Sequence, residues 1–145
     1  MESTDRQILT LLARDGRMSY TDIGRETGLS TSAAQQRVRR LEQRGLITGY
    51  RAVINPEAVG LVLTAFIELN GLDPATDEQI PDRLAHLSNI VSCYSVAGEA
   101  SYLLMVQVAT PADLESLLAK IRVAAGASTL TSLVLSIPFQ DRPVL

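Results

Sequence analysis

Cysteine and histidine each occur once in the 145-residue chain. Cys93 has no second cysteine with which to form an internal disulfide, which suits a reducing compartment, and its predicted strand favours a small core residue over a reactive thiol. His86 falls on a predicted helix, where we expect a solvated position and not a catalytic one. The sequence has no cysteine and histidine cluster and no glycine-rich phosphate loop, so it predicts no metal site, no catalytic site and no cofactor.

Long apolar runs are also absent. The longest, such as residues 102–106, are much shorter than the roughly 18 residues needed to span a bilayer. No charged and then apolar signal segment opens the chain. We therefore expect a cytoplasmic protein with no membrane partner. Hydrophobic residues make up 46% of the chain, which is enough for packed cores in one ordinary domain or two small ones.

The overall charge of −3 is distributed unevenly along the chain. Residues 1–55 contain nine arginines and six acidic residues, a net charge of +3. Residues 56–145 contain four basic and ten acidic residues, a net charge of −6. The positive field therefore lies in the first part of the chain, which is where a nucleic-acid partner is expected to bind.

The first 27 residues are predicted to form two helices. The first is capped by Thr4 or Asp5, has apolar residues at helical spacing, and ends near residues 15–16. The second is capped by Ser19, with Asp22 returning the bond in a capping box, and ends near Thr27.

A third helix follows almost at once. Gly28 supplies a turn, Ser30 a new cap, and residues 31–44 are predicted to form one uninterrupted helix. A helix, a tight glycine turn and a second helix make the helix-turn-helix pattern. Residues 46–54 alternate and contain Gly49, so we expect a short strand or wing after the third helix.

The third helix has one apolar side and one polar side. Ala34, Val38 and Leu41 recur at helical spacing and define its buried face. Six side chains fall away from that face: Ser32, Gln35, Gln36, Arg39, Arg40 and Gln43.

The polar side carries amide, hydroxyl and guanidinium groups, which bond base edges in the major groove and neutralise phosphates. We assign base readout to Ser32, Gln35 and Gln36, which lie near the start of the helix. Arg37, at the margin of the buried face, is assigned to phosphates with Arg39, Arg40 and Arg44, and Ser30 and Thr31 complete the expected DNA interface. The same face on an isolated helix would be read as solvated surface, but the capped helix, the turn and the positive charge together favour double-stranded DNA as the partner.

The second part of the chain alternates strand and helix signals. Strands are predicted at residues 61–69, 91–97, 102–109 and 130–137, and helices at residues 80–87 and from Thr110 onward. The order β-α-β-β-α-β is that of a ferredoxin-like fold. The prediction is an α+β protein: a winged helix-turn-helix domain at residues 1–55, a linker at about 55–60, and a ferredoxin-like domain at residues 61–145.

The predicted strands are apolar on both faces. Residues 102, 104, 106 and 108 point one way, while Leu103, Met105 and Ala109 point the other. Two helices can cover only one face of a sheet, and an uncovered apolar face would be a large exposed patch. We infer a homodimer in which a second subunit covers the other face.

The connection between the two middle strands brings backbone amides, the Glu99 carboxylate and the Ser101 hydroxyl into one tight loop. Such a loop can hold a small zwitterion, but by itself it is more often an ordinary turn at Gly98. Thr131 and Ser132, near the start of the last predicted strand, are by themselves ordinary surface.

Several short segments follow one another along the chain: residues 15–17 (Asp-Gly-Arg), 28–30 (Gly-Leu-Ser), 37–42 (Arg-Val-Arg-Arg-Leu-Glu), 45–50 (Gly-Leu-Ile-Thr-Gly-Tyr), 94–99 (Tyr-Ser-Val-Ala-Gly-Glu) and 102–104 (Tyr-Leu-Leu). In this order they resemble the Lrp/AsnC regulators, also called feast/famine regulatory proteins. The resemblance runs from about Thr4 to Ile137, nearly the whole chain.

The resemblance implies a DNA-binding dimer formed through the second domains, often assembled further into octamers, that responds to an amino acid. It places the effector where neighbouring dimers meet, near these residues: Tyr94, Gly98, Glu99, Ala100, Ser101, Tyr102, Thr131 and Ser132. The family pattern commonly has an aspartate where this chain has Ser101. A compensating role of Glu99, a different preferred amino acid and a lost response all stay open.

Two other functions stay open from the sequence. The second domain could make the protein an amino-acid sensor that acts through protein partners, with the helix-turn-helix used for protein contact. A small ferredoxin-like enzyme is the third alternative, although no catalytic motif argues for it.

Overall fold

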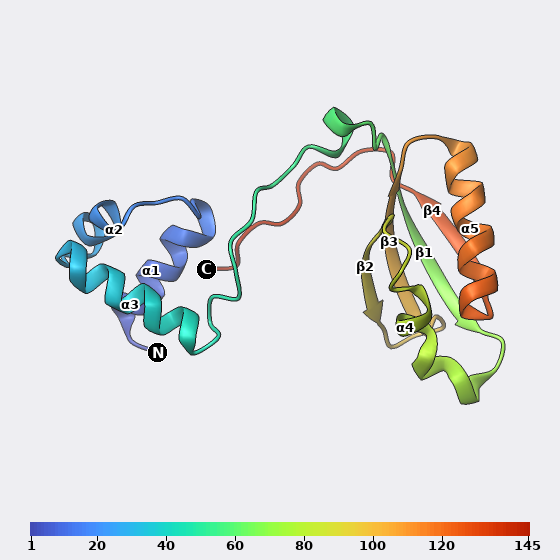
Figure 1. Cartoon of the computed structure of the whole chain (residues 1–145), viewed down its shortest axis with the longest axis horizontal. Coiled ribbons are helices and arrows are strands. Elements are labelled where there is room, and N and C mark those ends of the chain that lie inside the picture. Colours follow the sequence, from blue (N-terminus) through green and yellow to red (C-terminus); the bar gives the residue numbers. More distant parts are fainter. The chain divides into compact units, whose positions relative to one another are not determined.

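A computed structural model describes residues 1–145 of the chain. The chain divides into two compact units, Met1–Val53 with Phe139–Leu145, and Ile54–Pro138. The first unit is helical, and the second is a sheet with helices on one face (Figure 1).

The helical unit contains α1 (Ser3–Arg14), α2 (Tyr20–Thr27) and α3 (Thr31–Gln43). Its core is a small cluster of buried side chains from all three helices: Ile8, Ile23, Ala34, Val38 and Leu41. The predicted buried face of α3 is therefore confirmed. The Ser19 and Ser30 hydroxyls accept bonds from Asp22 N and Ala33 N at 3.0 and 3.1 Å, as expected for N-caps.

The predicted start of α1 is wrong. Glu2 holds the N-cap position, without a side-chain cap bond, so neither Thr4 nor Asp5 caps this helix. Asp5 lies in the first turn and is buried, because it has a partner on α3 that is described below. The Asp22 carboxylate does not return the predicted capping-box bond. It pairs instead with Arg25 at 3.5 Å.

The turn between α2 and α3 is held by a close approach at Gly24. The Leu29 N–H donates to Gly24 O at 2.8 Å. A Cβ at Gly24 would overlap Leu29 O, a backbone atom, so only glycine allows this close approach between α2 and the turn that leads to α3. The angle at which α3 leaves α2 therefore depends on a residue without a side chain.

No strand follows α3, so the expected wing is not formed. Residues 46–54 are neither helix nor strand. A strand needs a neighbour with which to share hydrogen bonds, and the helical unit contains no other strand. The segment instead begins by closing the end of α3, because both Leu46 N and Ile47 N donate to Leu41 O.

The second unit is an antiparallel sheet with the order β2-β3-β1-β4. Its strands are β1 (Leu63–Gly71), β2 (Ile90–Ser95), β3 (Tyr102–Val108) and β4 (Ala127–Leu133); its helices are α4 (Ile80–Leu84) and α5 (Pro111–Ala125), with the 3₁₀ turns η1 (Pro56–Val59) and η2 (Pro74–Gln79). The predicted α+β architecture and the β-α-β-β-α-β order are confirmed, and this order of strands is the ferredoxin-like one.

Most boundaries in this unit differ from the prediction by one or more residues, and the differences are largest at the last strand, which ends at Leu133 and not at residue 137, and at α4. The last strand begins at Ala127, three residues earlier than expected, because Gly126 ends α5 and the chain enters the sheet at once. Helix α4 ends at Leu84, where the Leu87 N–H donates to Leu84 O in a tighter turn. His86 therefore lies in this turn and not on a helix.

One face of the sheet carries the core, and α4 and α5 cover it (Figure 1). Ile67 and Leu104 are paired across β1 and β3 on this face and are fully buried. The other face has no cover within the unit. It carries apolar side chains from all four strands: Phe66, Tyr94, Leu103, Met105 and Leu130. Tyr94 and Leu130 are 52% and 65% exposed.

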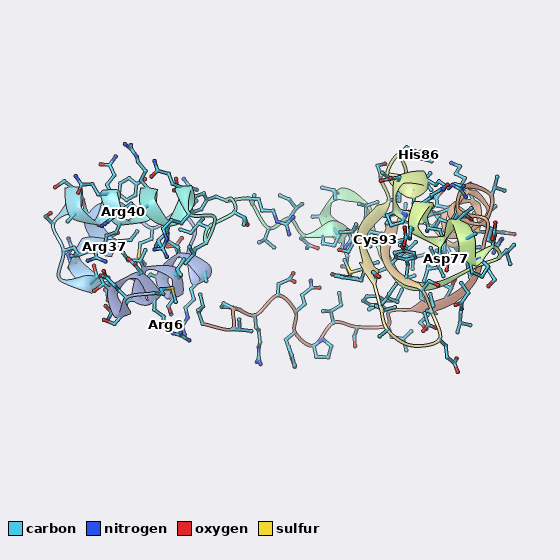
Figure 2. All side chains as sticks on the ribbon, turned by 90° about the horizontal axis from the view of Figure 1, so that it is seen from below. Arg6, Arg37, Arg40, Asp77, His86 and Cys93 are labelled. Carbon is cyan, nitrogen blue, oxygen red and sulfur yellow. The ribbon has the colours of Figure 1, made fainter.

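Cys93 is not the core residue that its strand predicted. It lies on the edge strand β2 opposite Leu104 and is exposed (Figure 2). An edge strand has a neighbouring strand on one side only, which leaves the Cys93 side chain open to solvent on the other. Partial burial still raises the pKa of the Cys93 thiol above its ordinary value.

Helices α1 and α3 are joined by Arg37. Its Nη1 donates to Asp5 Oδ1 at 3.0 Å and to Glu2 Oε2 at 2.8 Å. Both hydrogen bonds raise the pKa of Arg37 above its ordinary value, and the bond to Glu2 contributes more than the bond to Asp5. Asp5 is 8% exposed, and burying a carboxylate costs free energy unless a partner such as Arg37 bonds it.

We predict that Arg37→Ala lowers the thermal unfolding midpoint of the protein, because it leaves the buried Asp5 carboxylate without its partner. Arg40→Ala is the matched control, since Arg40 is an exposed arginine on the same helix that forms no ion pair. Circular dichroism during heating measures both midpoints. Equal midpoints for the two variants would contradict a structural role for Arg37.

Candidate nucleic-acid interface and effector site

The polar face of α3 lies at the surface of the helical unit. Six of its side chains are exposed, namely Ser32, Gln35, Gln36, Arg39, Arg40 and Gln43. The opposite face of α3 anchors the helix, because its residues Ala34, Val38 and Leu41 are at most 2% exposed. A helix anchored on one side presents the other side as a fixed surface.

The hydroxyls at the start of α3 are already engaged within the unit. Ser30 Oγ caps Ala33 N and lies 3.4 Å from Ser32 Oγ. Thr31 Oγ1 lies 3.2 Å from Thr21 Oγ1 of α2. Each hydroxyl keeps further bonding capacity, since a serine or threonine oxygen both donates and accepts. These contacts fix where the first turn of α3 presents its polar groups.

The arginines of α3 divide into two kinds. Arg39, Arg40 and Arg44 are exposed and form no ion pair within the chain. Their guanidinium groups are therefore available to anions such as phosphates. Arg37 differs, because its guanidinium is bonded to Glu2 and Asp5 on the side of α1 (Figure 2). We accordingly withdraw Arg37 from the expected phosphate contacts and assign it to the packing of α1 on α3.

Tyr50 is a residue that the sequence did not single out. Its hydroxyl donates to Glu42 Oε1 at 2.9 Å and so ties the segment after α3 back to the helix. Burial and the bond to Glu42 raise the pKa of Tyr50 to about 12, and burial contributes more. The contact spans eight residues across a helix end, and no spacing rule in the sequence predicts it.

In the second unit, the loop between β2 and β3 is fixed at the end of the central strand. Ser101 N donates to Leu69 O at 2.8 Å, and Val96 N donates to Ser101 O at 3.2 Å. Ala100 is buried and Glu99 is exposed. Gly98 and Glu99 therefore form the outer part of a loop whose base is closed by the bond between Val96 and Ser101 and is bonded to β1.

The other expected effector residues do not gather at this loop within one chain. Tyr94 is paired with Leu103 on the open face of the sheet, while Tyr102 is paired with Leu69 on the face that carries the core. Thr131 and Ser132 lie on β4, which β1 and β3 separate from the β2 edge, and they alternate between the two faces. Thr131 and Ser132 are paired with Ile67 and Phe66 of β1 and do not contact the loop after β2 through any hydrogen bond.

Asp77 is the residue at this loop that sequence reasoning missed. It lies in η2, and its Oδ2 accepts a bond from Ser101 Oγ at 3.1 Å. Its Oδ1 is buried and has no hydrogen-bond partner in the chain. Ser101 and Asp77 are 24 residues apart, and the polar segment around Asp77 carries no motif that would have pointed to it.

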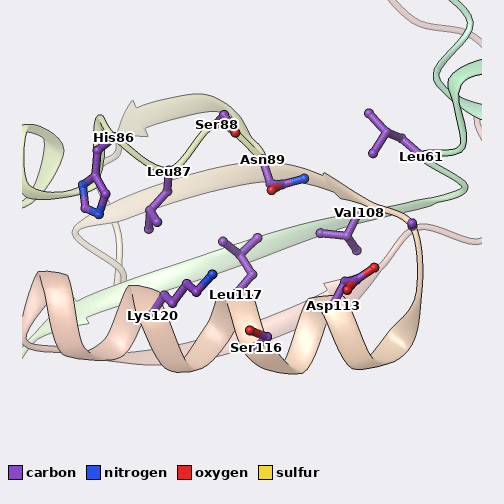
Figure 3. Close-up of a pocket in the computed structure, with 11 residues that line it drawn as sticks. Leu61, His86, Leu87, Ser88, Asn89, Val108, Asp113, Ser116, Leu117 and Lys120 are labelled. Carbon is purple, nitrogen blue, oxygen red and sulfur yellow. The ribbon is translucent and has the colours of Figure 1, made fainter.

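A separate cavity of about 390 Å³ lies between α5 and the turn that follows α4. Asp113, Ser116 and Lys120 line it from α5, opposite His86 and Asn89 (Figure 3). None of the expected effector residues lines this cavity. No group of three or more His, Cys, Asp or Glu side chains is placed to hold a metal ion. None of the helices is both long enough and apolar enough to cross a membrane.

Comparison with known proteins covers both units. Residues 1–42 match the AsnC-type helix-turn-helix domain, and residues 64–144 match the Lrp/AsnC ligand binding domain. The chain is 46% identical to the HTH-type transcriptional regulator LrpA of Mycobacterium tuberculosis over 142 residues. These residues cover 98% of this chain and 95% of that protein.

Solved structures agree with this match. A feast or famine regulatory protein from Mycobacterium tuberculosis, complexed with L-methionine, is 46% identical, with a TM-score of 0.95 and coverage of 98% of this chain and 97% of that one. Escherichia coli AsnC is 26% identical, with a TM-score of 0.91 and coverage of 99% and 97%. The chain therefore belongs to the Lrp/AsnC family and is a transcriptional regulator, not an enzyme, with a helix-turn-helix DNA-binding domain followed by a ligand-binding domain.

Proposed function

We propose that this regulator reads a specific DNA sequence with α3 and that an amino acid controls its assembly. The observation that carries the first half is the exposed polar face of α3, backed by the buried residues Ala34, Val38 and Leu41. Gln35, Gln36 and Ser32 are the base-reading residues in this proposal. Arg39, Arg40 and Arg44 contact phosphates, and Ser30 and Thr31 border the interface. The cytoplasm, where we place the protein, is then the compartment in which it meets its DNA.

The open face of the sheet supports a homodimer. Its apolar side chains lie on all four strands, and such a surface is stabilised when a second copy removes it from water. A dimer carries two helix-turn-helix units, which engage two half-sites of a roughly two-fold symmetric operator. We propose that dimers assemble further into octamers and that the effector binds between them.

An amino acid is the effector class that the comparisons support best. The second unit matches a ligand-binding domain, and the relative complexed with L-methionine is 46% identical to this chain. The effector residues in this proposal are those of the loop after β2, with Tyr94, and Thr131 and Ser132 from a neighbouring copy. Such a ligand changes DNA binding only if it binds two assembly states with unequal affinity.

The DNA half of the proposal is tested by incubating the full-length protein with sheared genomic DNA at physiological salt and sequencing the bound fragments. We expect enrichment of a shared, roughly two-fold symmetric site. Gln35→Ala should then weaken binding to that site by about 10- to 100-fold, because a base contact of this kind contributes roughly 1–3 kcal/mol, and leave binding to unrelated DNA unchanged.

Arg40→Ala is the matched control for Gln35→Ala. It removes a phosphate contact, so it should weaken binding to the selected site and to unrelated DNA alike and reduce the salt dependence of both. Equal loss on all sequences from Gln35→Ala would remove Gln35 from base readout. Tight amino-acid binding without any preference among DNA fragments would instead indicate a sensor that acts through protein partners.

The dimer is tested at Leu130, which is 65% exposed on the open face and lies opposite Glu68. Leu130→Lys should convert the dimer to a monomer, because the interface would have to bury an ammonium group, while Glu68 keeps the substitution favourable within the chain. Val123→Lys is the control, since Val123 is 86% exposed on α5, away from this face. Sedimentation velocity measures the masses, and circular dichroism checks that both variants are folded. A dimer that survives Leu130→Lys would place the interface elsewhere.

A further inference from the structure

The Asp77 carboxylate lies at the base of the proposed effector loop with only part of its bonding capacity used. Oδ2 accepts one bond from Ser101 Oγ, and the buried Oδ1 accepts none. A carboxylate has about four acceptor positions, and a buried oxygen without a donor costs free energy. Oδ1 of Asp77 is the only buried side-chain polar atom of the chain that lacks a partner. Because Oδ1 is enclosed against Gly71, the acceptor capacity that a ligand can use is that of Oδ2, which has one donor in the chain.

Gly71, the last residue of β1, creates the space for this carboxylate. A Cβ at Gly71 would overlap Asp77 Oδ1, so any side chain at this position would displace the Asp77 carboxylate. The same end of β1 fixes the loop, because Leu69 O accepts the bond from Ser101 N. The central strand thus holds the acid and the effector loop next to each other.

No positive group of the chain neutralises Asp77. The ion pairs of the chain all lie in the helical unit, where they involve Arg25 and Arg37. The expected compensating acid, Glu99, is exposed and makes no side-chain hydrogen bond. Asp77 is therefore the carboxylate that the fold fixes at this loop, bonded directly to Ser101.

We propose that Asp77, together with Ser101, recognises the ammonium group of the amino-acid effector. The proposal rests on the amino-acid response proposed above. An ammonium group has three N–H donors and a positive charge, which match an unpaired carboxylate beside a hydroxyl. Oδ2 has acceptor positions left beside the Ser101 hydroxyl, so it can accept an ammonium N–H there while Oδ1 stays buried against Gly71. Asp77 thus supplies the negative charge that position 101 does not.

The test compares two amino acids with their counterparts that lack only the ammonium group. L-Methionine and L-leucine are titrated calorimetrically against the full-length protein, beside 4-(methylsulfanyl)butanoate and 4-methylpentanoate. We expect the wild-type protein to prefer the amino acid of each pair. Asp77→Asn should weaken binding of the amino acid by roughly 10- to 100-fold, the effect of one charged hydrogen bond, and leave the des-amino acid unchanged.

Asp73→Asn is the matched control. Asp73 lies in the same turn, where its Oδ1 accepts from Ala75 N at 3.0 Å, and asparagine caps a turn equally well. It removes one negative charge from the same segment without touching Ser101, so it should not change the preference for amino acids. Asp77→Asn keeps the shape of the side chain and an oxygen that accepts from Ser101, so the unliganded unfolding midpoint checks that the loop is intact.

The outcomes separate the two proposals. If Asp77→Asn binds L-methionine and L-leucine as the wild type does, or loses the amino acid and the des-amino acid equally, Asp77 does not recognise the ammonium group, and the amino-acid response stands without it. The wild-type protein is also titrated with each of the other common L-amino acids; if none of them binds, the effector half of the proposed function fails and this proposal fails with it. The DNA selection experiment is independent of both results.

Discussion

The second unit depends on the position of β1 at the centre of the sheet. It pairs with β3 along one side and with β4 along the other, so a shift of β1 by one residue would move its core side chains to the open face and disturb both pairings. The register places Ala65, Ile67 and Leu69 in the core and Phe66 on the open face. The same strand therefore sets the core of one chain, the surface offered to a second chain, and at its end the anchor of the loop after β2.

The helical unit follows a comparable rule with a different period. Because every third or fourth residue of α3 is buried, the residues between them are committed to the surface whatever their chemistry. Arg37 shows why the margin of such a face is ambiguous. Its long side chain can point to solvent or toward α1. The ion pair with the buried Asp5 carboxylate holds it toward α1. The outer arginines have no such partner and keep their charge for an external anion.

Much of this architecture was predictable, because periodicity, caps and turns are local signals. The caps Ser19 and Ser30, the buried face of α3 and the order of the sheet elements all follow from residues close together in the sequence. The wing was wrong because alternation predicts a strand but not a partner for it. The unpredicted contacts join distant residues: Arg37 to Asp5 across 32 residues and Ser101 to Asp77 across 24. The roles assigned to the DNA and effector residues remain predictions.

The position of Asp77 suggests how ligand binding and assembly are linked. The loop after β2 leads directly into β3, and β3 carries Leu103 and Met105 on the open face. Ammonium binding at Asp77 would add donors to a carboxylate that now has one, and so stiffen the end of the sheet next to that face. A coupling of about 1–3 kcal/mol between two sites is typical of allosteric proteins, and one charged hydrogen bond of this kind supplies as much. Under the proposal above, an amino acid would need no large movement to favour one assembly over another; it would need only to bind more tightly where this loop meets a neighbouring copy.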